Sequence, residues 1–83
     1  MKYGLYAILD SKIGFMTPWV SHSDDTAIRT VNNASQEKEP NGINTNSEDK
    51  SLYRIGFFDD HDGTLTPDKL YIINVPERRP ENG

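Results

Sequence analysis

The stretch SLYRIGFFDDHDGTL, residues 51–65, decides the fold of this chain. Residues 52–58 are rich in aromatic and branched side chains, which favour a β-strand. Alternation along that strand predicts one face with Leu52, Arg54, Gly56 and Phe58, and an opposite face with Tyr53, Ile55 and Phe57. Turn-forming residues follow, and Gly63 supplies the positive φ that a bulged hairpin turn requires. We therefore predict a β-hairpin that returns along a short strand at residues 64–66.

Three further segments have the pattern of strands. Residues 3–9 are mostly apolar on both alternating faces, as expected of a central strand. Residues 13–16 form a second strand, which lies at an edge or stops there because Pro18 cannot donate to a ladder. Residues 70–75 form the last strand, and Pro76 ends it.

One helix is predicted over residues 24–36. Ser23 is a good N-cap, and Asp24 and Asp25 lie in the first turn, where the helix dipole favours negative charge. A narrow apolar stripe recurs at helical spacing and consists of Ala27, Ile28, Val31 and Ala34. This stripe predicts that the helix packs on the sheet through one side.

These segments predict a single α+β domain over residues 1–76. Its antiparallel sheet has about four to five strands, and the helix packs on that sheet. Residues 37–50 have no periodicity and almost nothing to bury, so we expect a mobile surface loop there. Residues 77–83 are expected to be a charged, flexible tail.

Size and composition limit the kind of protein. The chain has 83 residues with 34% hydrophobic content, so its core is small and a second copy of the chain would supply missing burial. We therefore expect a homodimer. Cysteine is absent, which excludes disulfides and thiolate chemistry, and no segment is apolar enough to cross a membrane. These features favour a protein of the cytoplasm without membrane contact.

Neither a metal site nor an enzyme is expected. If Gly63 is placed at the glycine position of a calcium loop, Phe58 and Lys69 fall where the first and last acidic ligands belong. Residues 59–62 therefore fit a plain turn better than a cation site. The chain also lacks a glycine-rich phosphate loop, and His22 and His61 are far apart in sequence. We expect no cofactor.

Charge and aromatic content favour different partners. The net charge of −4 opposes strong general attraction to phosphate backbones, which depends on clustered Lys and Arg. Aromatic side chains beside basic ones on a sheet face can stack on unpaired bases, and Tyr53 near Arg54 fits that pattern. Filling a small core or a dimer interface is the alternative role for these rings. Trp19 follows Pro18 outside regular structure, so we expect it to be the most exposed aromatic residue.

Two motifs resemble the small non-structural protein of gokushovirus-type microviruses, which are tailless phages with single-stranded DNA. The segment SDDTAIR at residues 23–29 resembles the motif that opens the helix of that family. The segment EDKSLYRIGFFD at residues 48–59 resembles the acidic turn and strand of the family, and YAILD at residues 6–10 is similar to its opening strand. Val31 departs from the family pattern, in which a bulky aromatic residue often stands there.

The resemblance implies a non-structural phage protein of the host cell cytoplasm that binds single-stranded DNA. Its implied role is genome replication, or the switch to single-strand synthesis and packaging. Our hypothesis is that Arg29 and Arg54 contact phosphates while Tyr53 or Trp19 stacks on a base. The alternative is an acidic, dimeric interaction module that binds a phage replication or procapsid protein without touching DNA.

Overall fold

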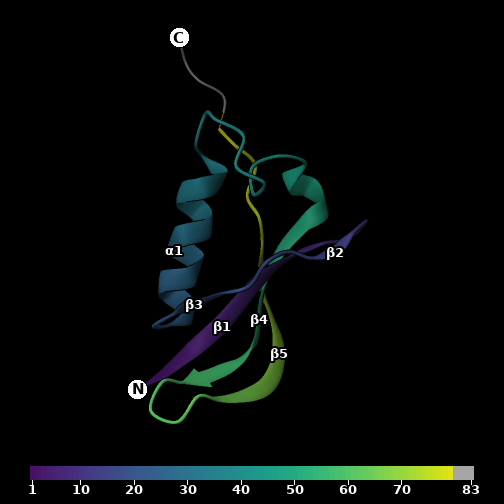
Figure 1. Ribbon diagram of the computed structural model, residues 1–83. Coiled ribbons are helices and arrows are strands. Elements are labelled where there is room, and N and C mark those ends of the chain that lie inside the picture. Colours follow the sequence, from purple (N-terminus) through teal and green to yellow (C-terminus); the bar gives the residue numbers. More distant parts are fainter. Residues whose placement is uncertain (80–83) are drawn as a thin grey trace.

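The computed structural model describes residues 1–79 and shows an antiparallel sheet with one helix against it (Figure 1). The strand order is β2-β1-β4-β5, and β3 also pairs with β1. The predicted α+β class with four to five strands and one helix is confirmed. The elements are β1 (Lys2–Asp10), β2 (Gly14–Phe15), β3 (Trp19–Ser21), α1 (Asp24–Ser35), a short 3₁₀ helix η1 (Ser47–Asp49), β4 (Lys50–Asp59) and β5 (Thr64–Asn74).

Strand β1 is the centre of the sheet. It pairs with β4 on one side, while β2 and β3 share its other side. Tyr6, Ala7 and Ile8 are at most 2% exposed, which agrees with a strand that is apolar on both faces. β3 was not predicted, because three residues after Pro18 are too few to show an alternating pattern.

Helix α1 packs through one narrow side. The Ser23 hydroxyl accepts a hydrogen bond from the Thr26 amide at 3.2 Å, so the predicted N-cap is present. Ala27 and Val31 are fully buried. They join a core cluster with residues from two strands and the segment after β5, namely Tyr6, Ile8, Leu52 and Val75, and Ile72 and Ile73 of β5 pack against it.

Strand β5 corrects one prediction about the hairpin. The sequence predicts separate strands at residues 64–66 and 70–75, but β5 runs without a break from Thr64 to Asn74. Pro67 lies inside this strand. β5 is the last strand on its side of the described sheet, so the missing amide of Pro67 costs no ladder hydrogen bond on the outer side.

The loop at residues 37–50 is held by asparagine side chains. The Asn41 amide donates to the carbonyl of Ala34 at 2.7 Å, and the Asn44 amide donates to the carbonyl of Glu37 at 2.9 Å. Lys50 is 7% exposed, and its ammonium donates to the carbonyls of Gly42 and Thr45. These contacts give the loop a defined path, while its predicted mobility stays a prediction.

The segment after β5 returns to the C-terminal end of α1. Gln36 donates to the carbonyl of Glu77 at 2.9 Å and accepts from the amide of Arg79 at 2.8 Å. The predicted flexible tail at residues 77–83 lies partly outside the described residues.

Candidate nucleic-acid interface

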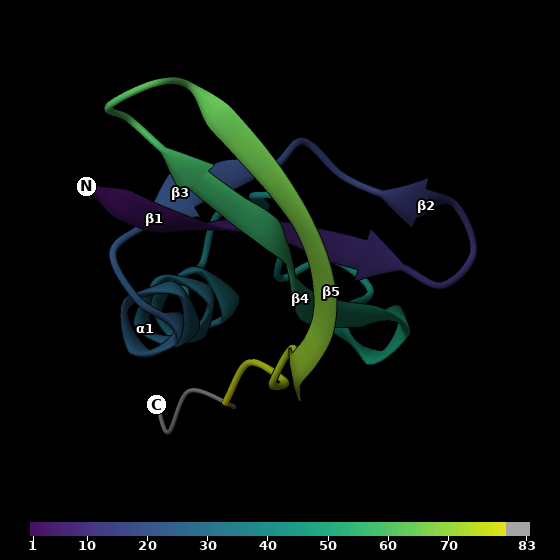
Figure 2. The same ribbon diagram turned by 90° about the horizontal axis from the view of Figure 1, so that it is seen from below.

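The sheet has one covered face and one face that we call the open face. Helix α1 covers the side that carries Tyr6, Ile8 and Leu52. Side chains alternate along β1, so Tyr3 and Leu5 belong to the opposite side. Figure 2 shows α1 on one side of the strands, and within residues 1–79 no helix lies over the open face.

Three aromatic rings lie side by side on the open face. Phe15 pairs with Leu9, Tyr53 pairs with Ala7 and Tyr71 pairs with Tyr53, so cross-strand pairing brings all three rings to the same face. The Phe15 and Tyr53 ring centroids are 5.5 Å apart, and those of Tyr53 and Tyr71 are 5.7 Å apart, both edge to face. Phe15 is 46% exposed and Tyr71 is 48% exposed. We call Phe15, Tyr53 and Tyr71 the aromatic row.

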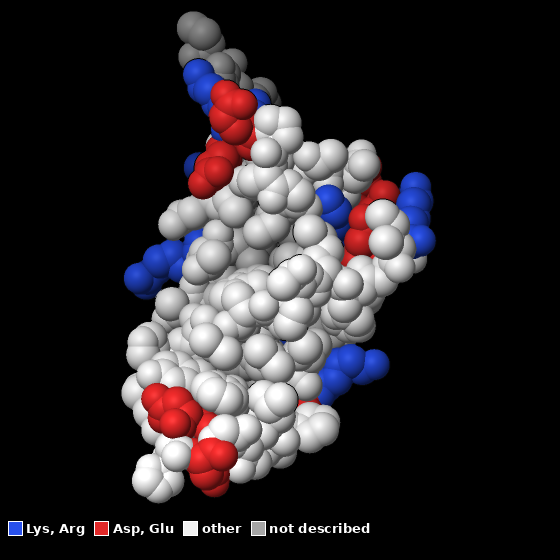
Figure 3. Space-filling model, viewed as in Figure 1, with Lys and Arg blue, Asp and Glu red and all other residues white. Residues whose placement is uncertain are grey.

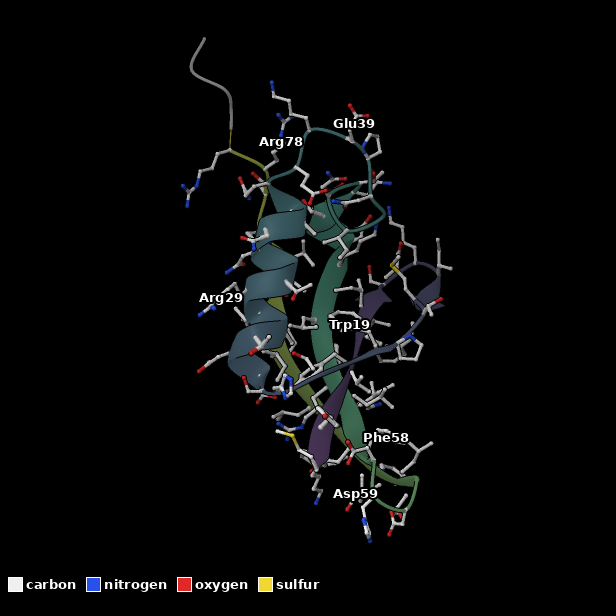
Figure 4. The ribbon with its side chains drawn as sticks, turned by 60° about the vertical axis from the view of Figure 1, so that its left-hand side comes forward. Trp19, Arg29, Glu39, Phe58, Asp59 and Arg78 are labelled. Atoms are coloured by element: carbon white, nitrogen blue, oxygen red, sulfur yellow. The ribbon has the colours of Figure 1, made fainter. Side chains whose placement is uncertain are left out.

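A second apolar group lies on the open face nearer the β4–β5 turn. Tyr3 pairs with Phe58, Phe58 pairs with Leu65, and Leu5 pairs with Val20. Leu65 is 63% exposed and Val20 is 49% exposed. Figure 4 shows Phe58 projecting on the opposite side of the strands from α1. We call these five residues the hairpin-end patch.

A β-bulge at Ile55 places these side chains and corrects the predicted faces of β4. Leu5 pairs with Gly56 and Tyr6 pairs with Arg54, so Ile55 has no partner in β1. The extra residue resets the alternation of the strand. Phe58 therefore shares the face of Tyr53, whereas strict alternation put the two on opposite faces.

Arg54 lies on the covered side, and its charge is used inside the protein. Its guanidinium donates to both carboxylate oxygens of Asp24, at 2.9 and 3.1 Å, and lies 4.7 Å from the Phe57 ring centroid. Its side chain is only 15% exposed. The Tyr6 hydroxyl donates to the same carboxylate at 2.5 Å. Burial and this hydrogen bond raise the pKa of Tyr6 well above its usual range.

Trp19 also lies on the covered side. It pairs with Tyr6 across the strands, and the two ring centroids are 6.2 Å apart. It packs against the core cluster, and its indole N–H is buried without a hydrogen-bond partner among the described residues. The expectation that Trp19 is the most exposed aromatic residue is wrong, because Phe15 and Tyr71 are more exposed.

Arg29 lies on the outer surface of α1. It is exposed and, as Figure 4 shows, extends away from the helix on the side remote from the sheet. The structure therefore does not bring the four predicted contact residues together. Tyr53 is on the open face, Trp19 and Arg54 lie in the layer between sheet and helix, and Arg29 is on the outside.

Sequence reasoning missed two of the three rings in the aromatic row. The sequence places Phe15 in an edge strand and Tyr71 in the last strand, but it contains no register that brings either of them beside Tyr53. The register between strands brings the three rings together, and no single segment of the sequence shows this register.

Charged side chains are unevenly distributed over the surface. Figure 3 shows a broad uncharged area over the middle of the viewed surface, with Lys, Arg, Asp and Glu toward its margins. At the hairpin end, the ammonium of Met1 bonds to Asp60 and lowers the pKa of that carboxyl. Hydrogen bonds from Thr64 lower the pKa of Asp62. Both carboxylates are therefore ionised at neutral pH, and the Met1 ammonium offsets the charge of Asp60.

The sequence of this chain matches the model of a known protein family. The family described as Phage ORF5 protein matches residues 3–77. The chain belongs to this phage protein family. The match spans all the strands and α1, so the Phage ORF5 protein family and the fold described above cover the same part of the chain.

Neither a curated protein nor a solved structure matches the chain. Among residues 1–79, no helix has the length and apolar content needed to cross a membrane. No pocket is present in the same part of the chain.

Proposed function

We propose that this protein binds single-stranded DNA through the aromatic row. The observation that carries the proposal is that Phe15, Tyr53 and Tyr71 lie side by side on an uncovered sheet face. Its biological setting would be replication of a microvirus-type phage genome in the host cytoplasm, or the switch to single-strand synthesis and packaging. The phage family supports that setting, as do the sequence motifs that resemble those of gokushovirus proteins.

Base stacking supplies most of the expected affinity. Stacking of a base on an aromatic side chain contributes roughly 1–3 kcal/mol and tolerates any sequence, because every base has a π-face. Phe15 and Tyr71 expose about half of their surface, so both have area to offer a base. The proposed stacking residues are therefore Tyr53, which the sequence also indicates, together with Phe15 and Tyr71.

We expect few contacts between this protein and the phosphates of the DNA. Lys12 forms an ion pair with Asp49 at 3.4 Å, and Arg54 is bound to Asp24. Lys69 is exposed and lies two residues from Tyr71 along β5, so we assign it the main phosphate contact. With one or two such contacts, the slope of log affinity against log salt should lie between about −0.7 and −1.4.

The test uses a fluorescently labelled oligothymidylate and anisotropy. Phe15→Ala and Tyr71→Ala should each weaken binding by about 5- to 150-fold, which corresponds to the loss of one stacked base. Ile13→Ala is the matched control, because Ile13 is 87% exposed and apolar but lies outside the row. Lys69→Ala should reduce the salt slope by about 0.7, whereas Arg29→Ala should leave it unchanged.

Two results would remove this proposal. One is the absence of binding at low salt, and the other is equal affinity for the wild type, Phe15→Ala and Tyr71→Ala. Emission from Trp19 serves here as a check on folding, since this ring lies on the side of the sheet that α1 covers.

An acidic protein-interaction module is the second candidate function. The hairpin-end patch favours it, because apolar side chains beside ionised Asp60 and Asp62 suit a protein surface better than a polyanion. The partner would be a phage replication or procapsid protein. Retention of that partner by Phe15→Ala and Tyr71→Ala, together with no DNA binding by the wild type, would favour this function.

A further inference from the structure

A serine and an asparagine lie together on the open face beside the aromatic row. Ser51 is two residues before Tyr53 on β4, and this part of the strand has no bulge, so the two side chains share a face. Asn74 pairs with Ser51 in the ladder, just as Tyr71 pairs with Tyr53. The Ser51 hydroxyl donates to Oδ1 of Asn74 at 3.2 Å. The two polar side chains therefore form the layer of the open face next to the two tyrosines.

This hydrogen bond leaves the amino group of Asn74 available. A carboxamide has an acceptor oxygen and an amino group with two N–H donors, on diverging arms. The hydroxyl of Ser51 lies against the oxygen, so the amino group is turned away from Ser51. Asn74 is exposed, and within residues 1–79 its amino group donates to no other group. The open face thus presents an oriented pair of donors at this position.

Asn74 is within reach of a base that stacks on Tyr71. The two residues occupy neighbouring layers of one face, since their partners Ser51 and Tyr53 are two positions apart on β4. That separation is about 7 Å along the strand, and a hydrogen bond of about 3 Å together with half the width of a base spans it. Tyr71 is 48% exposed, so it has ring area for such a base. Stacking supplies affinity for any base, whereas a donor beside the stack distinguishes one base edge from another.

The edges of the bases differ in what they offer to an N–H donor. Thymine has the acceptor O4, and guanine has the acceptors O6 and N7. The same edge of cytosine presents an amino group, which is itself a donor, and adenine presents one acceptor and one donor. Donors from Asn74 therefore suit the keto bases and oppose the amino group of cytosine.

We propose that Asn74 reads the edge of the base stacked on Tyr71 and favours thymine and guanine over cytosine, with Ser51 holding its carboxamide in place. This inference rests on the binding of single-stranded DNA proposed above, and it names the class of strand that is bound. Asn74 is the specificity-determining contact. Ser51 acts through Asn74 and is a positioning residue.

The experiment measures the affinity of the protein for two labelled strands of equal length, oligodeoxyuridylate and oligodeoxycytidylate, by anisotropy at slightly alkaline pH. The two bases have rings of the same size and differ only along one edge, where uracil has a carbonyl and cytosine an amino group. The wild type should bind the uracil strand about 2- to 12-fold more tightly, which corresponds to one hydrogen bond. Asn74→Ala should bind both strands equally.

Asn74→Asp gives the sharper result. A carboxylate keeps the hydrogen bond from Ser51 but replaces the donors by acceptors, and carboxylates accept from the amino group of cytosine. This variant should therefore reverse the preference, although its added charge weakens both complexes. Ser51→Ala should reduce the preference for uracil, because the carboxamide is then no longer held in one orientation.

Asn33→Ala is the matched control, since Asn33 is an exposed asparagine of α1, on the other side of the sheet. It should keep the preference of the wild type. Equal affinity of the wild type for both strands would overturn the inference and leave the proposed DNA binding intact, and so would an unchanged preference in Asn74→Asp. The absence of binding to either strand would overturn both. Circular dichroism of each variant separates lost recognition from a lost fold.

Discussion

At the residue scale, Arg54 shows how a side chain that sequence reasoning assigned to DNA serves the fold. Asp24 lies thirty positions earlier in the chain and supplies both carboxylate oxygens to its guanidinium. Phe57 stacks against the same group. The sequence motif suggested that Arg54 is free to contact DNA. Its side chain instead points to Asp24 at the N-terminal end of α1. This is why the role of the residue could not be predicted locally.

Removal of Asp24 should therefore destabilise the protein more than removal of its neighbour. Asp24→Ala leaves a largely buried guanidinium and the Tyr6 hydroxyl without their shared acceptor, at an expected cost of about 1–3 kcal/mol in unfolding free energy. Asp25→Ala loses only the dipole interaction of an exposed first-turn carboxylate, about 0.3–1 kcal/mol. Urea denaturation measures both values.

A second variant tests the same ion pair by removing the cation instead of the carboxylate. Arg54→Met removes the buried cation while leaving an apolar chain against Phe57, so its loss should be smaller than that of Asp24→Ala. Equal stability of Asp24→Ala and Asp25→Ala would show that the ion pair contributes nothing.

At the element scale, the helix and the longer strands were predictable because each has its own local pattern, whereas the three-residue β3 has none. The N-cap at Ser23 and the alternation at residues 3–9 are signals that a short window contains. The bulge at Ile55 and the unbroken path of β5 through Pro67 were not predictable in this way. Both depend on the register between strands and on which strand ends at an edge.

The close approach of β4 and β5 gives a prediction for Gly56. A Cβ atom at this position would stand 2.4 Å from the carbonyl oxygen of Thr66, which is backbone and cannot move aside. Gly56→Ala should therefore lower the unfolding free energy by about 1–3 kcal/mol. Lys69→Ala, at an exposed β5 position, should change it by less than about 0.5 kcal/mol.

Thermal and urea unfolding of the two variants provide the comparison. A Gly56→Ala protein as stable as the wild type would mean that β5 can shift away from β4 at no cost. That result would contradict the register of β4 and β5 beside Gly56.

At the scale of the whole molecule, one helix is too little to cover both faces of the sheet. The described chain covers the side with Tyr6 and Leu52 and leaves the aromatic row and the hairpin-end patch on the other. Composition predicted the shortage of burial, and the low hydrophobic content of 34% is the signal. Composition alone does not show which face of the sheet is open, because this depends on the face against which α1 packs.

The proposed use of the open face is compatible with the negative net charge of the protein. With a net charge of −4, the protein cannot rely on general attraction to phosphates. Under the proposed function, the three rings of the open face would bind bases with few phosphate contacts.

The most direct test is a nuclear magnetic resonance titration of the protein with a short oligothymidylate. The account predicts that the signals of Phe15, Tyr53 and Tyr71 shift together and saturate, while those of Ala27 and Arg29 in α1 stay in place. Shifts that gather on α1 around Arg29, or spectra that do not change at millimolar oligonucleotide, would contradict it.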